Sequence, residues 1–209
     1  MPEHTLYDQR MLPAVILAGG ASSRMGRPKA LLPTPDGELF VTRIVQTLAE
    51  AGLHDVVVVT GFEHEAIVAA VESGRVSMRP RVVRNPDPDR GQLSSLWCGL
   101  DAAVADDTPA VLVTLVDVPM ISTVTVAAVL DRWRETRAPI VRPLFQGRRG
   151  HPVIFGRSVF GELRAAPLDQ GARVVVHAHL HEAVDVPVDD PGCVADVDTF
   201  EDYRRLKGS

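Results

Sequence analysis

Short apolar runs rich in valine and isoleucine recur along this chain, and segments with helical patterning separate them. Such runs are typical of strands buried on both faces of a parallel sheet, because helices cover both faces of that kind of sheet. The runs are residues 14–17, 55–60, 81–84 and 110–115. The alternation predicts an α/β fold in which a mostly parallel sheet lies between two layers of helices.

Helical patterns fill the intervals, and the rhythm changes after Thr136. The helices expected before that point are residues 40–51, 64–73, 93–105 and 124–136. Two extended segments, 139–144 and 151–155, then flank a turn rich in glycine and arginine, which predicts a hairpin-like excursion with mixed strand directions. The remaining pattern predicts helices at 158–165, 172–178 and 199–207 and a strand at 183–188.

Composition narrows the class of protein. The chain has 209 residues, of which 45% are hydrophobic and 23% are charged. This predicts a single domain over residues 1–209 with one hydrophobic core. No stretch approaches the roughly 18 to 20 apolar residues that a membrane-spanning helix needs. Residues 1–12 are polar, which predicts a flexible tail rather than a secretion signal. The expected location is therefore the cytoplasm, with no membrane partner.

The formal net charge of −5 argues against a nucleic-acid partner, because a protein that binds the phosphate backbone needs a basic surface. Cys98 and Cys193 stand apart, without a CxxC pair, and are expected to be idle thiols. Alternating His177, His179 and His181 could chelate a transition metal. A helix is expected to give way to a strand there, which would scatter the three rings, so a surface histidine run is favoured.

A glycine-rich segment, residues 17–29, directly follows the first run. Ligands bind at the carboxyl ends of strands in such sheets, so the position is that of a site. Gly19 and Gly20 allow a tight turn that presents N–H groups to an anionic or planar ligand, and Arg24 and Lys29 add positive charge. The spacing matches neither GxxxxGK[ST] nor GxGxxG. The alternative is an ordinary glycine turn with exposed basic residues.

Carboxylates occur at two further positions of interest. Asp117 ends the fourth apolar run, where a buried charge is costly without a metal or another cation. Asp196 and Asp198 precede the final helix and share a face if that segment is extended. Other interpretations stay open at this point, because Asp198 or Thr199 could cap the helix and Asp117 could form a turn.

The glycine-rich segment resembles the signature LAGGxSxRMGxPK of the MobA-like nucleotidyltransferases. The resemblance implies a Rossmann-like three-layer sandwich of the nucleotide-diphospho-sugar transferase type and a loop that holds a nucleoside triphosphate. It also implies that Asp117 and Asp198 bind one Mg²⁺, with Asp196 as a nearby helper. The loop residues that match the signature and are implied to bind the nucleotide are Leu17, Ala18, Gly19, Gly20, Ser22, Arg24 and Lys29.

Within this family the chain resembles the molybdenum cofactor cytidylyltransferases over nearly its whole length. Residues 91–100 are similar to a segment near the nucleobase in those enzymes, which implicates Ser94 and Ser95 in nucleotide binding. Residues 150–155 are similar to a segment on the acceptor side, which implicates His151 and the adjacent Arg149, and makes residues 139–156 an acceptor-side hairpin insertion. Val118 is a departure, because those enzymes have glutamine there.

The implied activity is Mg²⁺-dependent transfer of CMP from CTP to the phosphate of the molybdopterin cofactor, with release of pyrophosphate. Lys29, Arg24 and Asp117 are the expected catalytic residues. A molybdoenzyme or its chaperone is the expected recipient of the product. The alternatives are a GTP-using molybdopterin guanylyltransferase, a nucleotidyltransferase with another phosphorylated acceptor, and a non-catalytic nucleotide-binding module.

Several of these residues also have structural interpretations. Ser94 or Ser95 could cap a helix, His151 could lie in a surface turn, and Arg149 could belong to a solvated basic loop. The loop at residues 85–91, rich in proline and aspartate, is interpreted as a surface connection in preference to a substrate gate.

Overall fold

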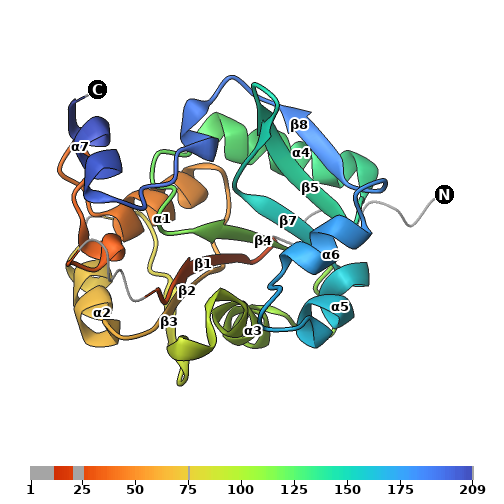
Figure 1. The fold of residues 1–209 in the computed structure, drawn as a ribbon, viewed down its shortest axis with the longest axis horizontal. Helices are drawn as coiled ribbons and strands as arrows, with labels where there is room; N and C mark the ends of the chain where they lie inside the picture. The colour runs from red at the N-terminus through yellow and green to blue at the C-terminus, as the bar shows by residue number, and fades with distance from the viewer. Residues whose placement is uncertain (1–11, 21–25, 75, 209) are drawn as a thin grey trace.

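The computed structural model describes residues 12–20, 26–74 and 76–208, and these contain one eight-stranded sheet (Figure 1). The order is β3-β2-β1-β4-β7-β5-β6, and β8 pairs with β5. The strands are β1 (Ala14–Ala18), β2 (Val56–Thr60), β3 (Arg81–Arg84), β4 (Ala110–Leu115), β5 (Ile140–Phe145), β6 (Arg148–Arg149), β7 (Val153–Gly156) and β8 (Val184–Pro187). β1 to β4 run parallel, whereas β7 is antiparallel to both β4 and β5. The expected change of strand direction is confirmed.

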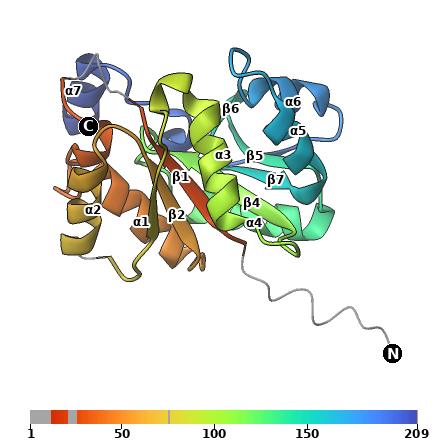
Figure 2. The ribbon, with the colours of Figure 1, turned by 90° about the horizontal axis from the view of Figure 1, so that it is seen from below.

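Helices cover both faces of the sheet, as a three-layer sandwich requires. They are α1 (Phe40–Glu50), α2 (His64–Ser73), α3 (Gln92–Ala103), α4 (Thr123–Thr136), α5 (Phe160–Ala165), α6 (Arg173–Ala178) and α7 (Phe200–Gly208). Figure 1 shows α3, α5 and α6 on one side of the sheet and α1 and α4 on the other, and Figure 2 shows α3 in front of the central strands. No helix in the described ranges is long and apolar enough to cross a membrane.

The hydrophobic core is divided by the sheet. Successive side chains of a strand point to opposite faces, so each central strand contributes to both halves. In β1, Ile16 belongs to the cluster with residues of α1, α2 and α4, and Val15 belongs to the cluster with residues of α3, α5 and α6. The two-sided burial explains why these strands read as continuous apolar runs.

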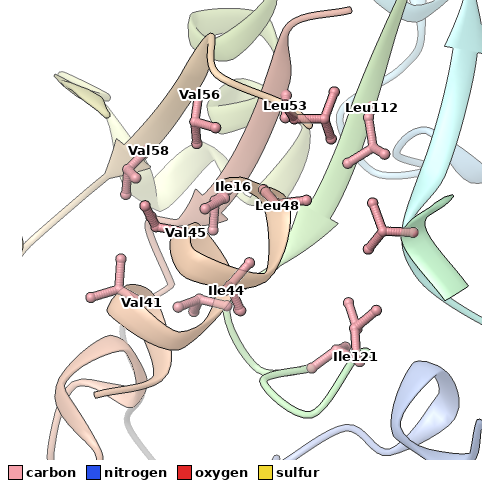
Figure 3. Packing of buried hydrophobic residues seen from close by; sticks show 14 of the residues in the cluster. Ile16, Val41, Ile44, Val45, Leu48, Leu53, Val56, Val58, Leu112 and Ile121 are labelled. Carbon is pink, nitrogen blue, oxygen red and sulfur yellow. The ribbon is translucent and has the colours of Figure 1, made fainter. Parts of the chain in front are cut away.

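Helix α1 shows how one half of the core is built. Its apolar residues recur at helical spacing, so Val41, Ile44, Val45 and Leu48 form one buried face. Figure 3 shows this face packed beside Ile16 of β1. Burial of a side chain of this size contributes roughly 1.5–3 kcal/mol through its transfer from water. This packing holds α1 over β1 and thereby helps to fix the strand ends where ligands bind.

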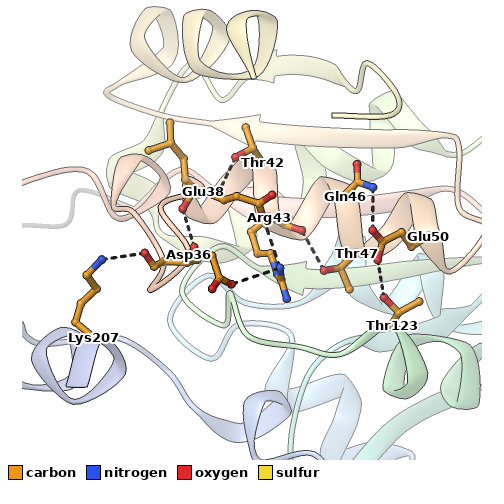
Figure 4. Close-up of polar contacts among 11 residues, drawn as sticks. Asp36, Glu38, Thr42, Arg43, Gln46, Thr47, Glu50, Thr123 and Lys207 are labelled. Carbon is orange, nitrogen blue, oxygen red and sulfur yellow. Dashed lines mark hydrogen bonds and ion pairs between the residues drawn. The ribbon is translucent and has the colours of Figure 1, made fainter. Parts of the chain in front are cut away.

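Polar contacts tie the outer side of α1 and its preceding loop to other helices (Figure 4). Gln46 donates to Glu50 at 2.9 Å, and Glu50 accepts from Thr123 at the start of α4 at 3.1 Å. Lys207 of α7 donates to the backbone carbonyl of Thr34 at 3.0 Å. A single bond of this kind contributes only about 1 kcal/mol. Together the bonds link segments that are distant in the sequence.

The predicted hairpin is present. Gln146 and Gly147 connect β5 to β6 with φ angles of 48° and 80°, both in the left-handed region that a two-residue hairpin turn requires. β6 contains only two residues, and the chain then returns to place β7 between β4 and β5. This insertion of β7 brings the residues after the hairpin next to the carboxyl end of β4.

Candidate active site

Two adjoining cavities lie at the carboxyl ends of β1 and β4. We name the first the loop cavity; its volume is about 440 Å³ and its lining includes Gly19, Gly20, Lys29, Ser95, Asp117 and Asp198. We name the second the hairpin cavity; its volume is about 720 Å³ and its lining includes Arg142, Arg149, His151, Leu168, Arg173 and Leu180. Leu17, Gln92 and Leu115 line both cavities. The site therefore has two compartments, at the end of the sheet that the sequence indicated.

The Lys29 ammonium lies between two carboxylates from distant parts of the chain. Its Nζ donates to Asp117 Oδ2 at 3.1 Å and to Asp198 Oδ1 at 2.5 Å. Burial of Lys29 disfavours its charge, but the hydrogen bond to Asp198 and the charge of Asp117 outweigh that effect and raise the pKa of Lys29. The side chain is 14% exposed and stays cationic in the wall of the loop cavity.

The segment that carries Asp198 is fixed from both sides. Val197 is buried in the core, and its N–H donates to the backbone carbonyl of Asp117 at 2.8 Å. On the other side, Thr199 accepts from the N–H of Asp202 at 3.1 Å, and Asp202 in turn accepts from the N–H of Thr199 at 2.8 Å. This reciprocal pair caps α7. Thr199, not Asp198, is therefore the capping residue, and Asp198 is left to face Lys29.

The two aspartates fit a divalent cation. Asp117 Oδ1 is buried and has no hydrogen-bond partner among the described residues, so one carboxylate oxygen remains for a ligand. Mg²⁺ accepts one or two carboxylates because phosphate oxygens and waters complete its octahedral shell. Within the described ranges, no group of three or more His, Cys, Asp or Glu side chains is arranged for a metal. A cation at this position would therefore depend on phosphate and water ligands.

Asp196 adds negative charge next to this pair. Burial raises the pKa of Asp196, and the charges of Asp117 and Asp198 raise it further because like charges disfavour ionisation. The charges of Arg148 and Lys29 oppose this rise, and the three carboxylates outnumber these two cations. The excess of negative charge favours a cation as a partner.

The glycine-rich loop approaches helix α3 closely. A Cβ atom on Gly19 would lie 2.7 Å from Ser95 Oγ, so a larger residue at this position displaces the serine. A Cβ atom on Gly20 would meet nothing within 4 Å, which leaves this stretch of backbone open to the cavity. Leu17 and Ala18 line the loop cavity as well. The structure thus gathers the predicted loop residues around one space, except Ser22 and Arg24, which lie outside the described residues.

The two serines of α3 have different surroundings. Ser95 lines the loop cavity, and Ser94 is buried with its hydroxyl donating to the carbonyl of Gly91 at 2.7 Å. Neither serine caps α3, because Gly91 is the N-cap residue and no side chain caps it. The loop before α3 is a surface connection over most of its length, since residues 86–91 are exposed or half-buried, but its first residue, Asn85, is buried and donates to both serines. The sequence pattern alone did not identify Asn85 as a residue near the site.

Two arginines in the hairpin cavity share one carboxylate. Asp185 of β8 accepts from Arg142 Nε at 2.7 Å and from Arg149 Nε at 2.8 Å. Burial of Asp185 opposes its charge, but the two guanidinium groups hold its pKa below the usual range. Arg149, which the sequence suggested, is thus held by an ion pair and is not simply solvated. Two guanidinium groups paired with one carboxylate leave a net positive charge in the wall of the hairpin cavity.

Arg142 and Arg173 are cavity residues that sequence reasoning missed. Arg142 is 6% exposed and lies in the otherwise apolar strand β5. A charge inside such a run is a signal that could have revealed it, because a buried arginine needs an anionic partner. Arg173 begins α6 and lines the same cavity. It gave no comparable signal, since a basic residue at the first position of a short helix is ordinary.

His151 is enclosed in the wall of the hairpin cavity. Its backbone N–H donates to the carbonyl of Cys193 at 2.8 Å. Burial lowers the pKa of the imidazole, although the charge of Asp117 and a backbone hydrogen bond with Val113 oppose this effect. The Nδ1 atom is buried and has no partner among the described residues. The surface-turn interpretation is therefore wrong, and one ring nitrogen remains available to a ligand.

The histidine run and the two cysteines lie apart from the Lys29 and aspartate cluster in the lining of the loop cavity. His177 lines the hairpin cavity, whereas His179 pairs with Glu162 at 2.9 Å and with Glu182 at 3.0 Å, so these two rings have different surroundings. Both cysteines are free thiols. Burial raises the pKa of Cys193 to about 11, which makes it unreactive.

The chain is similar to known proteins over most of its length. Residues 14–184 match the profile of the MobA-like NTP transferase domain. Nicotine blue oxidoreductase of Paenarthrobacter nicotinovorans is 36% identical over 203 residues, covering 92% of this chain and 94% of that protein. Molybdenum cofactor cytidylyltransferase of Escherichia coli (strain K12) is 25% identical over 194 residues, with the same coverage of 92% and 94%.

A solved structure matches the whole fold. Rv0371c from Mycobacterium tuberculosis H37Rv superposes with a TM-score of 0.78 and 29% sequence identity, covering 96% of this chain and 100% of that one. The same protein has been solved in complex with manganese, which superposes with a TM-score of 0.73. The Rossmann-like sandwich expected from the glycine-rich signature is confirmed. With its signature residues gathered at the strand ends and most of its length matched, this chain belongs to the MobA-like NTP transferase family.

Proposed function

We propose that the chain transfers the CMP moiety of CTP to the phosphate of a molybdopterin-type acceptor and releases pyrophosphate. The observation that carries the proposal is the meeting of Lys29, Asp117 and Asp198 in a cavity that adjoins a second, arginine-bearing cavity. The triphosphate would occupy the loop cavity and the acceptor the hairpin cavity. The relative named molybdenum cofactor cytidylyltransferase supports this choice of base and acceptor.

The chemistry requires little beyond alignment and charge neutralisation. An oxygen of the acceptor phosphate attacks the α-phosphorus of CTP, and the bond to the bridging oxygen breaks so that pyrophosphate leaves with the electron pair. A phosphate monoester is largely dianionic near pH 7, because its second pKa is about 6, so no general base is needed. Lys29 neutralises charge on the leaving pyrophosphate, and Arg24 is proposed from the sequence for the same role.

Asp117 and Asp198 would hold the divalent cation, and Asp196 would add to the negative field around it. Bound Mg²⁺ supplies charge neutralisation to the triphosphate. The ammonium of Lys29 can pair with phosphate oxygens once its two carboxylates have a metal partner. The manganese complex of Rv0371c supports a divalent ion at a site of this fold.

The hairpin cavity suits a flat molecule with an anionic group. Leu168 and Leu180 are partly exposed apolar residues in its lining, and they offer contact area to a ring system. Arg142, Arg149 and Arg173 supply positive charge for a phosphate. His151 would contribute its unpartnered Nδ1 to the acceptor.

A nucleotide panel tests the proposal. Thermal unfolding is followed with CTP, GTP, ATP and UTP, each with and without Mg²⁺. A ligand at about 100 times its Kd stabilises the folded state by about 2.7 kcal/mol, so we expect a clear Mg²⁺-dependent rise in Tm with CTP and a smaller one with the other three. Incubation of α-labelled CTP with molybdopterin should then yield a labelled conjugate and pyrophosphate. A larger rise with GTP would favour a guanylyltransferase, and absence of any rise would contradict nucleotide binding.

A second candidate is an oxidoreductase that acts on a planar aromatic compound. It is favoured by the 36% identity to nicotine blue oxidoreductase across 92% of this chain. Val118, in place of the glutamine usual in the cytidylyltransferases, is buried and adds no polar group near the acceptor. NADH and NADPH serve as probes, and their oxidation in the presence of nicotine blue is followed by absorbance. Turnover there, with no transfer from CTP, would replace the first proposal by the second.

A further inference from the structure

Asn85 is a buried amide that contacts Ser95, a residue in the lining of the loop cavity. It follows β3, it is 2% exposed, and its backbone N–H donates to the carbonyl of Thr60 at the end of β2 at 2.9 Å. Its side chain lies between the backbone of Asp87 and the first turn of α3. A buried amide in such a position must satisfy both of its ends.

The contacts of Asn85 determine the orientation of its side-chain amide. The N–H of Asp87 donates to Oδ1 at 3.0 Å, and only the oxygen of an amide can accept from an N–H. The Nδ2 group must therefore face the serines, and it donates to Ser94 Oγ at 2.8 Å and to Ser95 Oγ at 3.0 Å. Both hydroxyl oxygens act as acceptors here, so each serine must give its own proton to another group.

The two serines differ in where that proton can go. Ser94 donates to the carbonyl of Gly91 at 2.7 Å. In the part of the chain that the structure describes, Ser95 has no acceptor for its proton, and its hydroxyl lines the loop cavity beside Gly19. A hydroxyl that accepts from a fixed amide and has no other partner presents its proton to whatever fills the cavity.

Strand order tells which part of a nucleotide Ser95 would meet. β1 lies between β2 and β4. The Cβ position of Gly19 lies 2.7 Å from Ser95 Oγ and 3.7 Å from the backbone nitrogen of Gly61, which follows β2. Asp117 follows β4, on the other side of β1, and neighbouring strands are about 4.8 Å apart. Ser95 is therefore separated from the Lys29 and aspartate cluster that receives the phosphates.

We propose that Asn85 is a positioning residue that sets the direction of the Ser95 hydroxyl, so that this hydroxyl donates to an acceptor atom of the nucleoside. The proposal rests on the proposed nucleotide site and deepens it. It makes Ser95 a donor only, and it assigns Ser94 to the support of the loop. The sequence could not distinguish the two adjacent serines, because the distinction depends on the orientation of one amide.

The variant Asn85→Asp tests the direction directly. A carboxylate keeps the size of the side chain and still accepts from the N–H of Asp87, but it cannot donate to Ser95. The Ser95 proton would then turn to the carboxylate and away from the cavity. We expect the Kd for CTP with Mg²⁺, measured by calorimetry, to rise about tenfold in Asn85→Asp and in Ser95→Ala. The double variant Asn85→Asp/Ser95→Ala should bind CTP no more weakly than Asn85→Asp alone, since both changes remove the same hydrogen bond from Ser95 to the nucleoside.

Two comparisons separate this role from a structural one. Ser94→Ala should change the Kd for CTP by less than about twofold, because its proton is already bound to Gly91. Inorganic tripolyphosphate with Mg²⁺ should bind equally well to wild type and to Ser95→Ala, since it has no nucleoside. Ser95→Ala removes a single oxygen, so it decides the question even if Asn85→Asp fails to fold.

Each contrary outcome has a distinct meaning. Wild-type affinity for CTP in Ser95→Ala, or an equal loss in Ser94→Ala, overturns the role of Asn85 and leaves the nucleotide site intact. An equal loss of affinity for tripolyphosphate overturns the assignment to the nucleoside. Failure of the wild-type protein to bind any of the four nucleotides overturns the proposed function and this proposal with it.

Discussion

Lys29 separates two carboxylates that would otherwise repel each other. Asp117 comes from the end of β4 and Asp198 from the segment before α7, so the contact between them and Lys29 joins three distant parts of the chain. The pKa of Lys29 is raised despite its burial, which shows that the carboxylates dominate its surroundings. Residues held in this way are arranged for charge control and not for proton transfer.

Asp117→Asn should impair catalysis far more than stability. The change keeps the shape but removes the charge that pairs with Lys29 and with a metal, so we expect kcat for transfer from CTP to fall by about 10²-fold or more. The Tm should change little, because Asp117 Oδ1 is buried without a partner and an amide can occupy the same place. Asp196→Asn is the matched control and should lose less activity. A near-wild-type kcat in Asp117→Asn would refute the metal assignment.

At the scale of elements, the hydrophobic pattern predicted most of the fold. The predicted strand at residues 110–115 is β4 itself, and the helix predicted at 40–51 ends one residue earlier as α1. These elements are long or strongly patterned, so local sequence determines them. The insertion of β7 between β4 and β5 was not predicted, because strand neighbours depend on tertiary contacts that a pattern does not encode.

The candidate site was predicted in part for the same reason. Lys29, Asp117 and Asp198 occupy positions of recognisable sequence motifs, and the structure brings the three side chains together. Asn85 and Arg142 were missed because their roles arise from burial and from partners on other elements. That the chain forms one domain over residues 1–209 stays a prediction, as do the roles of Ser22 and Arg24.

Packing of α1 on the sheet yields a stability prediction. Leu48 is 1% exposed and belongs to the cluster beneath α1, so Leu48→Ala should lower the free energy of unfolding by about 2–5 kcal/mol through lost transfer energy and a residual cavity. Gln46→Ala on the outer side of the same helix removes only polar contacts and should cost about 1 kcal/mol or less. Urea denaturation measures both, and a cost for Leu48→Ala no larger than for Gln46→Ala would contradict this account of the core.

For the molecule as a whole, stability should respond to pH through His179, which links the end of α6 to α5. Hydrogen bonding to Glu162 raises the pKa of His179, and Glu182 adds to the effect. A raised folded-state pKa stabilises the fold below the unfolded value of about 6.5, and this contribution is lost as pH rises through the folded-state pKa.

The variant His179→Gln tests this dependence. The difference in Tm between wild type and His179→Gln should be larger at about pH 6 than at about pH 9, because the imidazole is charged only at the lower pH. His181→Gln is the control, since His181 is exposed and has no ion pair among the described residues. A difference in Tm that is the same at both pH values would exclude an electrostatic role for His179.

The wall that the two cavities share has a consequence for the pace of turnover. Leu17, Gln92 and Leu115 line both compartments, so ligands bound in the two cavities would lie against the same side chains. A reaction that joins those ligands produces one molecule that retains the contacts of both, and two linked binding events hold it more strongly than either alone. For the proposed transfer, we therefore expect departure of the product, and not bond formation, to set the turnover rate. A slow departure would give a downstream protein time to collect the conjugate directly, before it reaches bulk solvent.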